Sequence, residues 1–202
     1  MKKQGLESMG RRKFKATTNS NHSRPVAPNL LNREFEVGRP NTVYAGDITY
    51  IPTQEGWLYL AVLIDLYSRA VVGWAMSERI NAQWVTDALV ISIWRRRPGK
   101  GLLVHSDQGS QYASELYQET LNANGFICSM SRKGNCWDNA PSESFFHTLK
   151  TELVHHRRYQ TRAEAKQEIF EYIEVFYNRQ RLHSTIGYQT PSGYEEQNRN
   201  AA

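Results

Sequence analysis

The sequence predicts an α/β domain in which helices flank a β-sheet. Of the 202 residues, 40% are hydrophobic and 11% are aromatic, which is enough for a sizeable core. Three apolar, strand-like segments come first, and helix-like and strand-like segments then alternate. No run of eighteen apolar residues occurs and the start is polar, so the sequence predicts neither a membrane span nor a secretory signal.

The predicted strands are short runs rich in β-branched and aromatic residues. They cover residues 44–51, 57–64, 70–76, 102–105 and 126–130. The second run is almost wholly apolar, as expected for a strand that is buried on both faces. Residues 65–69 are typical of a turn between the second and third strands.

The predicted helices are recognised by their caps and their apolar spacing. They cover residues 82–95, about 112–124, from 139 onward and from 162 onward. Asn81 caps the first helix, and Pro141 is tolerated only in the first turn of the third. A capping box at 161–164 starts the last helix. The expected apolar stripe of that helix is Ala165, Ile169, Ile173 and Phe176.

Three acidic residues occupy unusual positions in this pattern. Asp47 interrupts a β-prone run, Asp107 directly follows the fourth strand, and Glu143 begins the third helix. An unpaired carboxylate in a strand is costly, so convergence of the three on Mg²⁺ or Mn²⁺ is one explanation. Such a site can cut and join phosphodiesters. The spacing alone is a weak signal, because twenty acidic residues give many pairs.

Lys150 adds a cation to the third helix. It follows Glu143 by seven residues, so the two side chains lie about 20° apart on one helical face. A metal-binding acid and a phosphate-binding lysine would then point at one substrate. Otherwise Lys150 is an exposed lysine that pairs with nearby acids.

Blocks of sequence around these residues carry a family resemblance. They are Gly46-Asp47-Ile48-Thr49-Tyr50 and the segments 105–112, 134–140, 143–150, 177–183 and 187–191. Together they resemble the catalytic core of the DDE transposase and retroviral integrase superfamily, and more narrowly the OrfB-type transposases of bacterial insertion sequences. The resemblance spans about residues 29–194. One departure is Tyr44, where the family usually has a tryptophan, although an aromatic residue is kept.

The resemblance implies a ribonuclease-H-like fold with a five-stranded mixed sheet flanked by helices. It implies that Asp47, Asp107 and Glu143 hold two Mg²⁺ (or Mn²⁺) ions and catalyse DNA strand cleavage and strand transfer. Double-stranded DNA would be the partner of a homo-oligomer in the bacterial cytoplasm, at the nucleoid. The expected DNA contacts are Lys150, Asn135, Asn139, Arg179, Arg181 and His183. The alternatives are a nuclease of the same fold without strand transfer, and an inactive DNA-binding remnant.

Positive charge is concentrated at the start of the chain. Residues 1–41 carry nine Lys/Arg against three Asp/Glu, whereas the remainder carries sixteen against seventeen. We expect residues 1–41 to be a flexible basic arm, which either contacts the phosphate backbone of DNA or is simply solvated. The arm would be a link to an upstream DNA-binding region, or a remnant of one. A DNA-binding protein encoded in an upstream reading frame is a possible partner of this arm. Residues 42–195 form the expected core, and 196–202 form a tail.

Several other polar residues have simple structural explanations. Asp65 also follows a strand, but a turn acid paired with Arg69 is the simpler interpretation. His105 either packs with a hydrogen bond or touches substrate. A zinc set of His105, Cys128 and Cys136 lacks clustered spacing, so reduced thiols are expected. Turn or cap positions explain Asn135, Asp138 and Asn139. Compensation of the helix dipole, or solubility, explains Arg95, Arg96, Arg97 and Lys100.

Overall fold

A computed structural model describes residues 22–199, with a five-stranded sheet at its centre. The strands are β1 (Val43–Thr53), β2 (Gly56–Asp65), β3 (Val71–Ser77), β4 (Leu103–Ser106) and β5 (Ile127–Met130). They lie in the order β3-β2-β1-β4-β5. β2 pairs antiparallel with β1 and β3, whereas β4 pairs parallel with β1 and β5. The predicted five-stranded mixed sheet is therefore confirmed.

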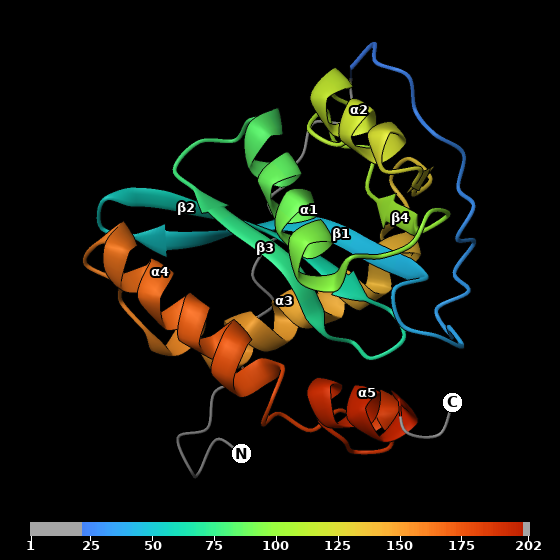
Figure 1. Cartoon of the computed structure of the whole chain (residues 1–202). Helices are drawn as coiled ribbons and strands as arrows, with labels where there is room; N and C mark the ends of the chain where they lie inside the picture. Colours follow the sequence, from blue (N-terminus) through green and yellow to red (C-terminus); the bar gives the residue numbers. More distant parts are fainter. Residues whose placement is uncertain (1–21, 200–202) are drawn as a thin grey trace, which may run out of the picture.

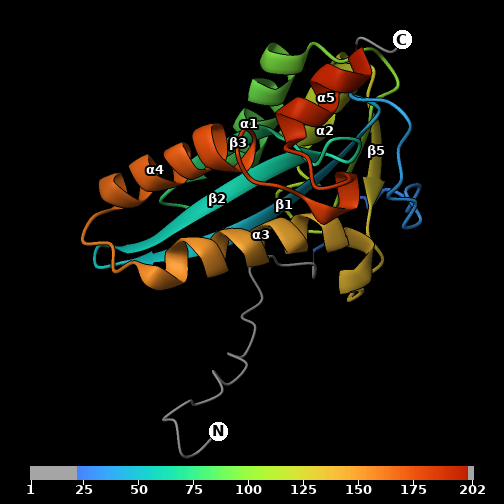
Figure 2. The same ribbon diagram turned by 90° about the horizontal axis from the view of Figure 1, so that it is seen from below.

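Helices cover both faces of this sheet. The α-helices are α1 (Ala82–Arg96), α2 (Glu115–Ala123), α3 (Ala140–Glu152), α4 (Arg162–Glu171) and α5 (Pro191–Arg199). Figure 1 shows α1 and α2 on one face, and Figure 2 shows α3 on the other. The shorter helices are η2 (Cys136–Asn139), η3 (Val154–His156), η4 (Tyr172–Tyr177) and η5 (Ser184–Ile186). Among residues 22–199, no helix is long and apolar enough to cross a membrane.

The interior strand β2 packs against the core on both faces, as its sequence predicts. Ala61 and Leu63 pack in the core cluster that includes α1, whereas Leu60, Val62 and Ile64 pack in the cluster that includes α3 and α4. This alternation is the two-residue period of a strand. The strand therefore joins the two halves of the core.

The contact between β3 and α1 depends on a glycine. A Cβ atom added to Gly73 would lie 2.3 Å from the carbonyl oxygen of Ala88 and 2.7 Å from Cβ of Ser92. These distances are shorter than any van der Waals contact, so only glycine lets the helix approach this closely. Gly73 thereby sets how tightly α1 packs on the sheet.

The last long helix departs from its expected apolar stripe at one position. The first three positions of the stripe are buried, but Phe176 is 40% exposed and Tyr177 is buried in its place. The amide of Asn178 donates to the carbonyl of Ile173, five residues back, and Tyr172–Tyr177 is a π-helix. The wider turn shifts the buried face by one residue.

Residues 22–41, which we call the strap, pack against the core instead of forming a linker. The amide of Met130 donates to the carbonyl of Pro28, and the amides of Leu30 and Leu31 donate to the hydroxyl of Ser129. Leu31 is almost fully buried. Figure 2 shows this segment in blue beside β5. The expected flexible arm is therefore wrong for the strap, and residues 1–21 lie outside the described residues.

The buried turn acid Asp65 has a different partner from the predicted one. Its carboxylate lies 3.5 Å from the guanidinium of Arg96 and accepts the amide of Asn41 at 2.8 Å. The side chain of Arg69, the predicted partner, instead donates to the carbonyl of Phe35. Arg96 lies far from Asp65 in sequence, so local spacing favoured the wrong arginine.

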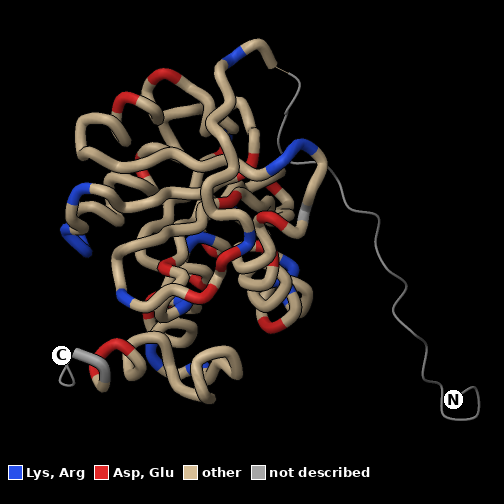
Figure 3. Tube along the Cα trace, turned by 90° about the vertical axis from the view of Figure 1, so that its right-hand side faces the viewer, with Lys and Arg blue, Asp and Glu red and all other residues tan. Residues whose placement is uncertain are grey.

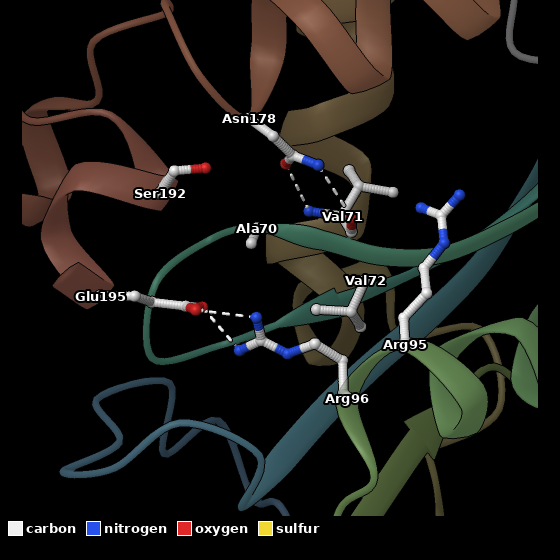
Figure 4. A pocket seen from close by; sticks show the side chains of 8 residues that line it. All are labelled: Ala70, Val71, Val72, Arg95, Arg96, Asn178, Ser192 and Glu195. Carbon is white, nitrogen blue, oxygen red and sulfur yellow. Dashed lines mark hydrogen bonds and ion pairs between the residues drawn. The ribbon is translucent and has the colours of Figure 1, made fainter. Parts of the chain in front are cut away.

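Two polar contacts, one at helix α5 and one at the edge strand β3, tie the C-terminal part of the chain to the core (Figure 4). Arg96 donates to both carboxylate oxygens of Glu195 at 2.7 Å. Asn178 clamps the edge strand by accepting the amide of Val71 and donating to its carbonyl. Arg96 therefore serves packing rather than only the helix dipole. Because α5 continues to Arg199, the tail expected from residue 196 begins within a helix.

Candidate active site

Parallel pairing of β1 and β4 brings two of the candidate acids together. Val43 pairs with Leu103 and Ala45 with His105, an offset of 60 residues in each case. The same offset, continued two residues further, sets Asp107 beside Asp47. Both lie at the carboxyl side of the β1–β4 pairing, where parallel sheets commonly place functional side chains.

The two carboxylates are close enough to repel each other. The pKa of Asp47 is raised well above its usual value, first by removal of the carboxylate from water and then by the charge of Asp107. Glu143 raises it further. The amide of Ile48, which donates to Asp47 at 2.8 Å, and the ammonium of Lys150 oppose the shift. The site therefore holds more negative charge than its own cations offset.

Helix α3 presents Glu143 and Lys150 to this carboxylate pair. Glu143 lies in its first turn with an exposed side chain, and Lys150 lies in its last turn. The ammonium of Lys150 sits 4.7 Å from the ring centroid of Tyr50. Burial lowers the pKa of Lys150, whereas Asp47 raises it. The predicted common face therefore points toward Asp47.

The three acids do not form a closed ligand set in this conformation. Within residues 22–199, no group of three or more His, Cys, Asp or Glu side chains is close enough to hold a metal ion. His105, a member of the zinc set rejected on spacing, is buried and pairs through Nδ1 with the Ser129 hydroxyl at 2.9 Å. Burial lowers its pKa to about 4. The packed, hydrogen-bonded alternative for His105 is thus confirmed, and the side chain of Cys136 lies outside the described residues.

Asn139 was expected to contact DNA, but it is buried. Its side-chain amide donates to the carbonyl of Gly46 at 3.3 Å, which ties the start of α3 to the residue before Asp47. In this conformation Asn139 positions the start of α3, and its contact with DNA stays a prediction. Asn135 is half-buried, and its Oδ1 has no hydrogen-bond partner among the described residues.

The expected basic cluster after the last helix is largely used in packing. Arg181 forms an ion pair with Glu152 at 2.8 Å. The ring of His183 packs edge-on against Tyr177 at 4.8 Å, and burial lowers its pKa to about 4. Arg179 is exposed. Of the three, only Arg179 extends fully into solvent.

Sequence reasoning missed the anchoring role of Asp138. Its fully buried carboxylate accepts hydrogen bonds from Arg33 Nε at 2.7 Å, Asn29 Nδ2 at 2.9 Å and the amide of Arg132 at 2.9 Å. Burial raises its pKa, but these donors outweigh burial and lower it overall. Asp138 thus fastens the loop before α3 to the strap. Nothing in the local sequence distinguishes it from a turn or cap residue.

Tyr112 was also missed as a neighbour of the acids. Its ring packs against Tyr117, and its buried hydroxyl has no partner among the described residues. Burial raises its pKa first, and the charges of Asp47 and Asp107 add to this effect. The signal available in the sequence was its position in the block that contains Asp107.

Charge on the described part of the chain is balanced. Residues 22–199 contain nineteen Lys/Arg and nineteen Asp/Glu, and Figure 3 shows both signs interspersed along the trace. The net charge of +5 therefore resides in residues 1–21. Electrostatic attraction to a polyanion would come mainly from that segment and from local cations such as Lys150.

Sequence comparison matches two family models, both described as "Integrase core domain", to residues 38–136 and 143–198. The chain is 51% identical over 191 residues to the insertion element IS600 31 kDa protein of Shigella sonnei, covering 95% of this chain and 70% of that protein. It is 47% identical over 198 residues to the transposase InsF for insertion sequence IS3A of Escherichia coli, covering 98% and 69%.

The fold resembles that of solved retroviral integrases. The HTLV-2 integrase catalytic core domain in complex with magnesium superposes with a TM-score of 0.58 at 15% identity, covering 77% of this chain and 97% of that one. At this identity the likeness concerns the fold. The predicted ribonuclease-H-like architecture is thereby confirmed.

Proposed function

This chain belongs to the integrase core family and is a DDE transposase of the insertion-sequence type, and we propose that it cuts DNA at the element's ends and joins those ends to a target. The observation that supports this most directly is the convergence of Asp47, on β1, and Asp107, directly after the neighbouring parallel strand β4. Glu143 and Lys150 face them from α3.

The acids fit a hard divalent cation. Carboxylate oxygens are the ligands that Mg²⁺ and Mn²⁺ prefer. Burial first, and then the charges of Asp107 and Glu143, raise the pKa of Asp47, and a bound cation would offset both effects. Asp47, Asp107 and Glu143 would hold two Mg²⁺ ions. Since the Glu143 side chain is exposed, rotation about its own bonds would let it join the other two. When bound, the ions would stabilise the charge that develops on the reacting phosphate.

The residues of this site would orient the DNA for in-line displacement. In cleavage, water oxygen bonds to phosphorus as the phosphorus–O3′ bond breaks. In joining, the freed 3′-hydroxyl attacks a target phosphodiester, whose own O3′ leaves. Neither step needs a covalent protein intermediate. Lys150 would position the phosphate next to the element's end, since its ammonium lies on the Glu143 face of α3.

The remaining contacts are proposed from charge and exposure. Arg179 would meet the DNA backbone, and the cations of residues 1–21 would add non-specific affinity. Residues 42–195 would form the catalytic core, working in the cytoplasm as a homo-oligomer on double-stranded DNA at the nucleoid. An upstream-frame DNA-binding protein remains a proposed partner.

Purified protein incubated with labelled element-end DNA and a plasmid target tests this function. With Mg²⁺ or Mn²⁺ it should release 3′-hydroxyl ends and insert them into the plasmid, and EDTA should abolish both reactions. Cleavage without insertion would instead support a nuclease of the same fold. DNA binding without either reaction would support an inactive remnant.

A further inference from the structure

Trp137 presents a large aromatic ring to solvent in the loop that leads into α3. Its side chain is 69% exposed, although rings of this size are usually well buried. The preceding residues 131–136 are mostly small, polar or basic, so they do not extend the apolar surface of the ring along the chain. Figure 2 shows this loop, in gold, at the start of α3.

The two residues that follow Trp137 fix it in place. Asp138 is fully buried and receives hydrogen bonds from the strap and from the loop itself. Asn139 donates to the carbonyl of Gly46, the residue before Asp47. Because both neighbours are anchored, the exposed ring projects from a backbone segment that is fixed two residues before the contact between Asn139 and the residue preceding Asp47. This arrangement costs little ordering entropy when a ligand binds.

The loop that carries Trp137 also carries two exposed cations. The side chain of Arg132 is 48% exposed even though it lies 3.6 Å from Asp138, and Lys133 is exposed. Cationic side chains next to a flat aromatic surface are the usual components of a site for single-stranded nucleic acid. The cations attract the backbone, and the ring stacks on a base.

We propose that Trp137 stacks on an unpaired nucleobase at the DNA end, next to the phosphate held at Asp47 and Asp107. This assignment rests on the proposed function, because it places the base beside the reacting phosphate. Stacking would offset the free energy lost when the terminal base pair opens. Since every base has a π-face, this contact would tolerate different sequences.

The test compares two duplexes of one sequence, one blunt and one with a short unpaired 3′ end that carries 2-aminopurine. Both are titrated with full-length protein in EDTA, so that no DNA is cut. Trp137→Ala should weaken binding of the unpaired end about tenfold and remove the stacking-induced quenching of 2-aminopurine. Trp137→Phe should retain most of the affinity for the unpaired end and most of the quenching. Loss on the blunt duplex should be smaller, because stacking there must also open a base pair.

Trp94→Ala is the matched control. Trp94 is 76% exposed and lies on α1, on the opposite face of the sheet, so its removal should change neither affinity nor fluorescence. Three results would each overturn the proposal. They are unchanged DNA affinity and 2-aminopurine quenching in Trp137→Ala, equal losses of affinity on both duplexes, and a change in oligomeric state instead of DNA affinity. If the binding results hold but wild-type protein shows no Mg²⁺-dependent joining, the proposed function fails while base stacking stands.

Discussion

Replacing Asp138 with alanine should loosen the strap and the loop before α3 together. The substitution removes one buried carboxylate that accepts hydrogen bonds from Asn29, Arg33 and Arg132. The contacts with Asn29 and Arg33 join residues more than a hundred positions apart in sequence, so their loss affects the tertiary structure rather than one turn. Trp137, the residue before Asp138, would lose its neighbouring anchor as well.

The size of the effect follows from the exposure of the donors. A hydrogen bond to a charged group contributes about 1.5–3 kcal/mol. The side chains of Arg33 and Arg132 are 41% and 48% exposed, so they regain water when Asp138 is removed. We therefore expect a total loss of about 2–3 kcal/mol rather than the sum of three full bonds. This corresponds to a fall of about 4–12 °C in Tm for a chain of this length.

Thermal and urea unfolding of wild type, Asp138→Ala, Arg33→Ala and the double variant measures this loss. The double-mutant cycle should show positive coupling between the two residues. Because the folded-state pKa of Asp138 is lowered, its contribution exists above the unfolded value near 4 and should fade as the pH falls below it. Arg179→Ala, at an exposed site, should change stability by less than about 0.5 kcal/mol. A loss in Asp138→Ala of that same small size would refute the reasoning.

Three further predictions follow from single contacts. Gly73→Ala should lower the free energy of unfolding in urea by about 3 kcal/mol, because the added Cβ would meet the carbonyl of Ala88. Gly99→Ala, which has open space around it, should lower it far less. Equal losses would contradict the close approach of α1 to Gly73. Lys150→Ala should weaken affinity for element-end DNA and reduce the slope of log affinity against log salt concentration by about one, and Lys150→Arg should recover part of the affinity. Unchanged affinity would mean that Lys150 is only a surface charge. The pKa of folded His183 is lowered to about 4, so His183 should destabilise the protein as the pH falls below about 6.5; His105 should do the same, so His183→Gln should reduce the loss of stability between pH 7 and 5 without removing it, and an unchanged slope would exclude a contribution from His183.

The elements that could be predicted are those whose signals are local. The alternating burial of β2 and the cap at Asn81 follow from residues within one segment. The common face of Glu143 and Lys150 follows from helix geometry alone. The expectation that Asp47 and Asp107 meet needed the family resemblance, because the sequence does not state that β1 and β4 are parallel neighbours.

The features that could not be predicted depend on distant partners. The π-helix at Tyr172–Tyr177 shifts the buried face by one residue, and a regular helical period cannot show this. Arg96 reaches Asp65 and Glu195 only because the fold brings the last turn of α1 close to the end of β2 and to α5. The burial of Asn139 likewise follows from its contact with β1. Each is a tertiary contact with no signature in the adjacent residues.

Strand transfer in Mg²⁺ by three isosteric variants tests the central claim most directly. Asp47→Asn, Asp107→Asn and Glu143→Gln should each reduce joining of element ends by at least about 100-fold, because each removes a charged ligand with little change in volume. Tm of Asp47→Asn and Asp107→Asn should stay at or above that of wild type, since repulsion between the two carboxylates is relieved. Asp87→Asn, at an exposed acid on α1, should join normally. Full activity in any of the three variants would contradict the assignment of that residue to the site.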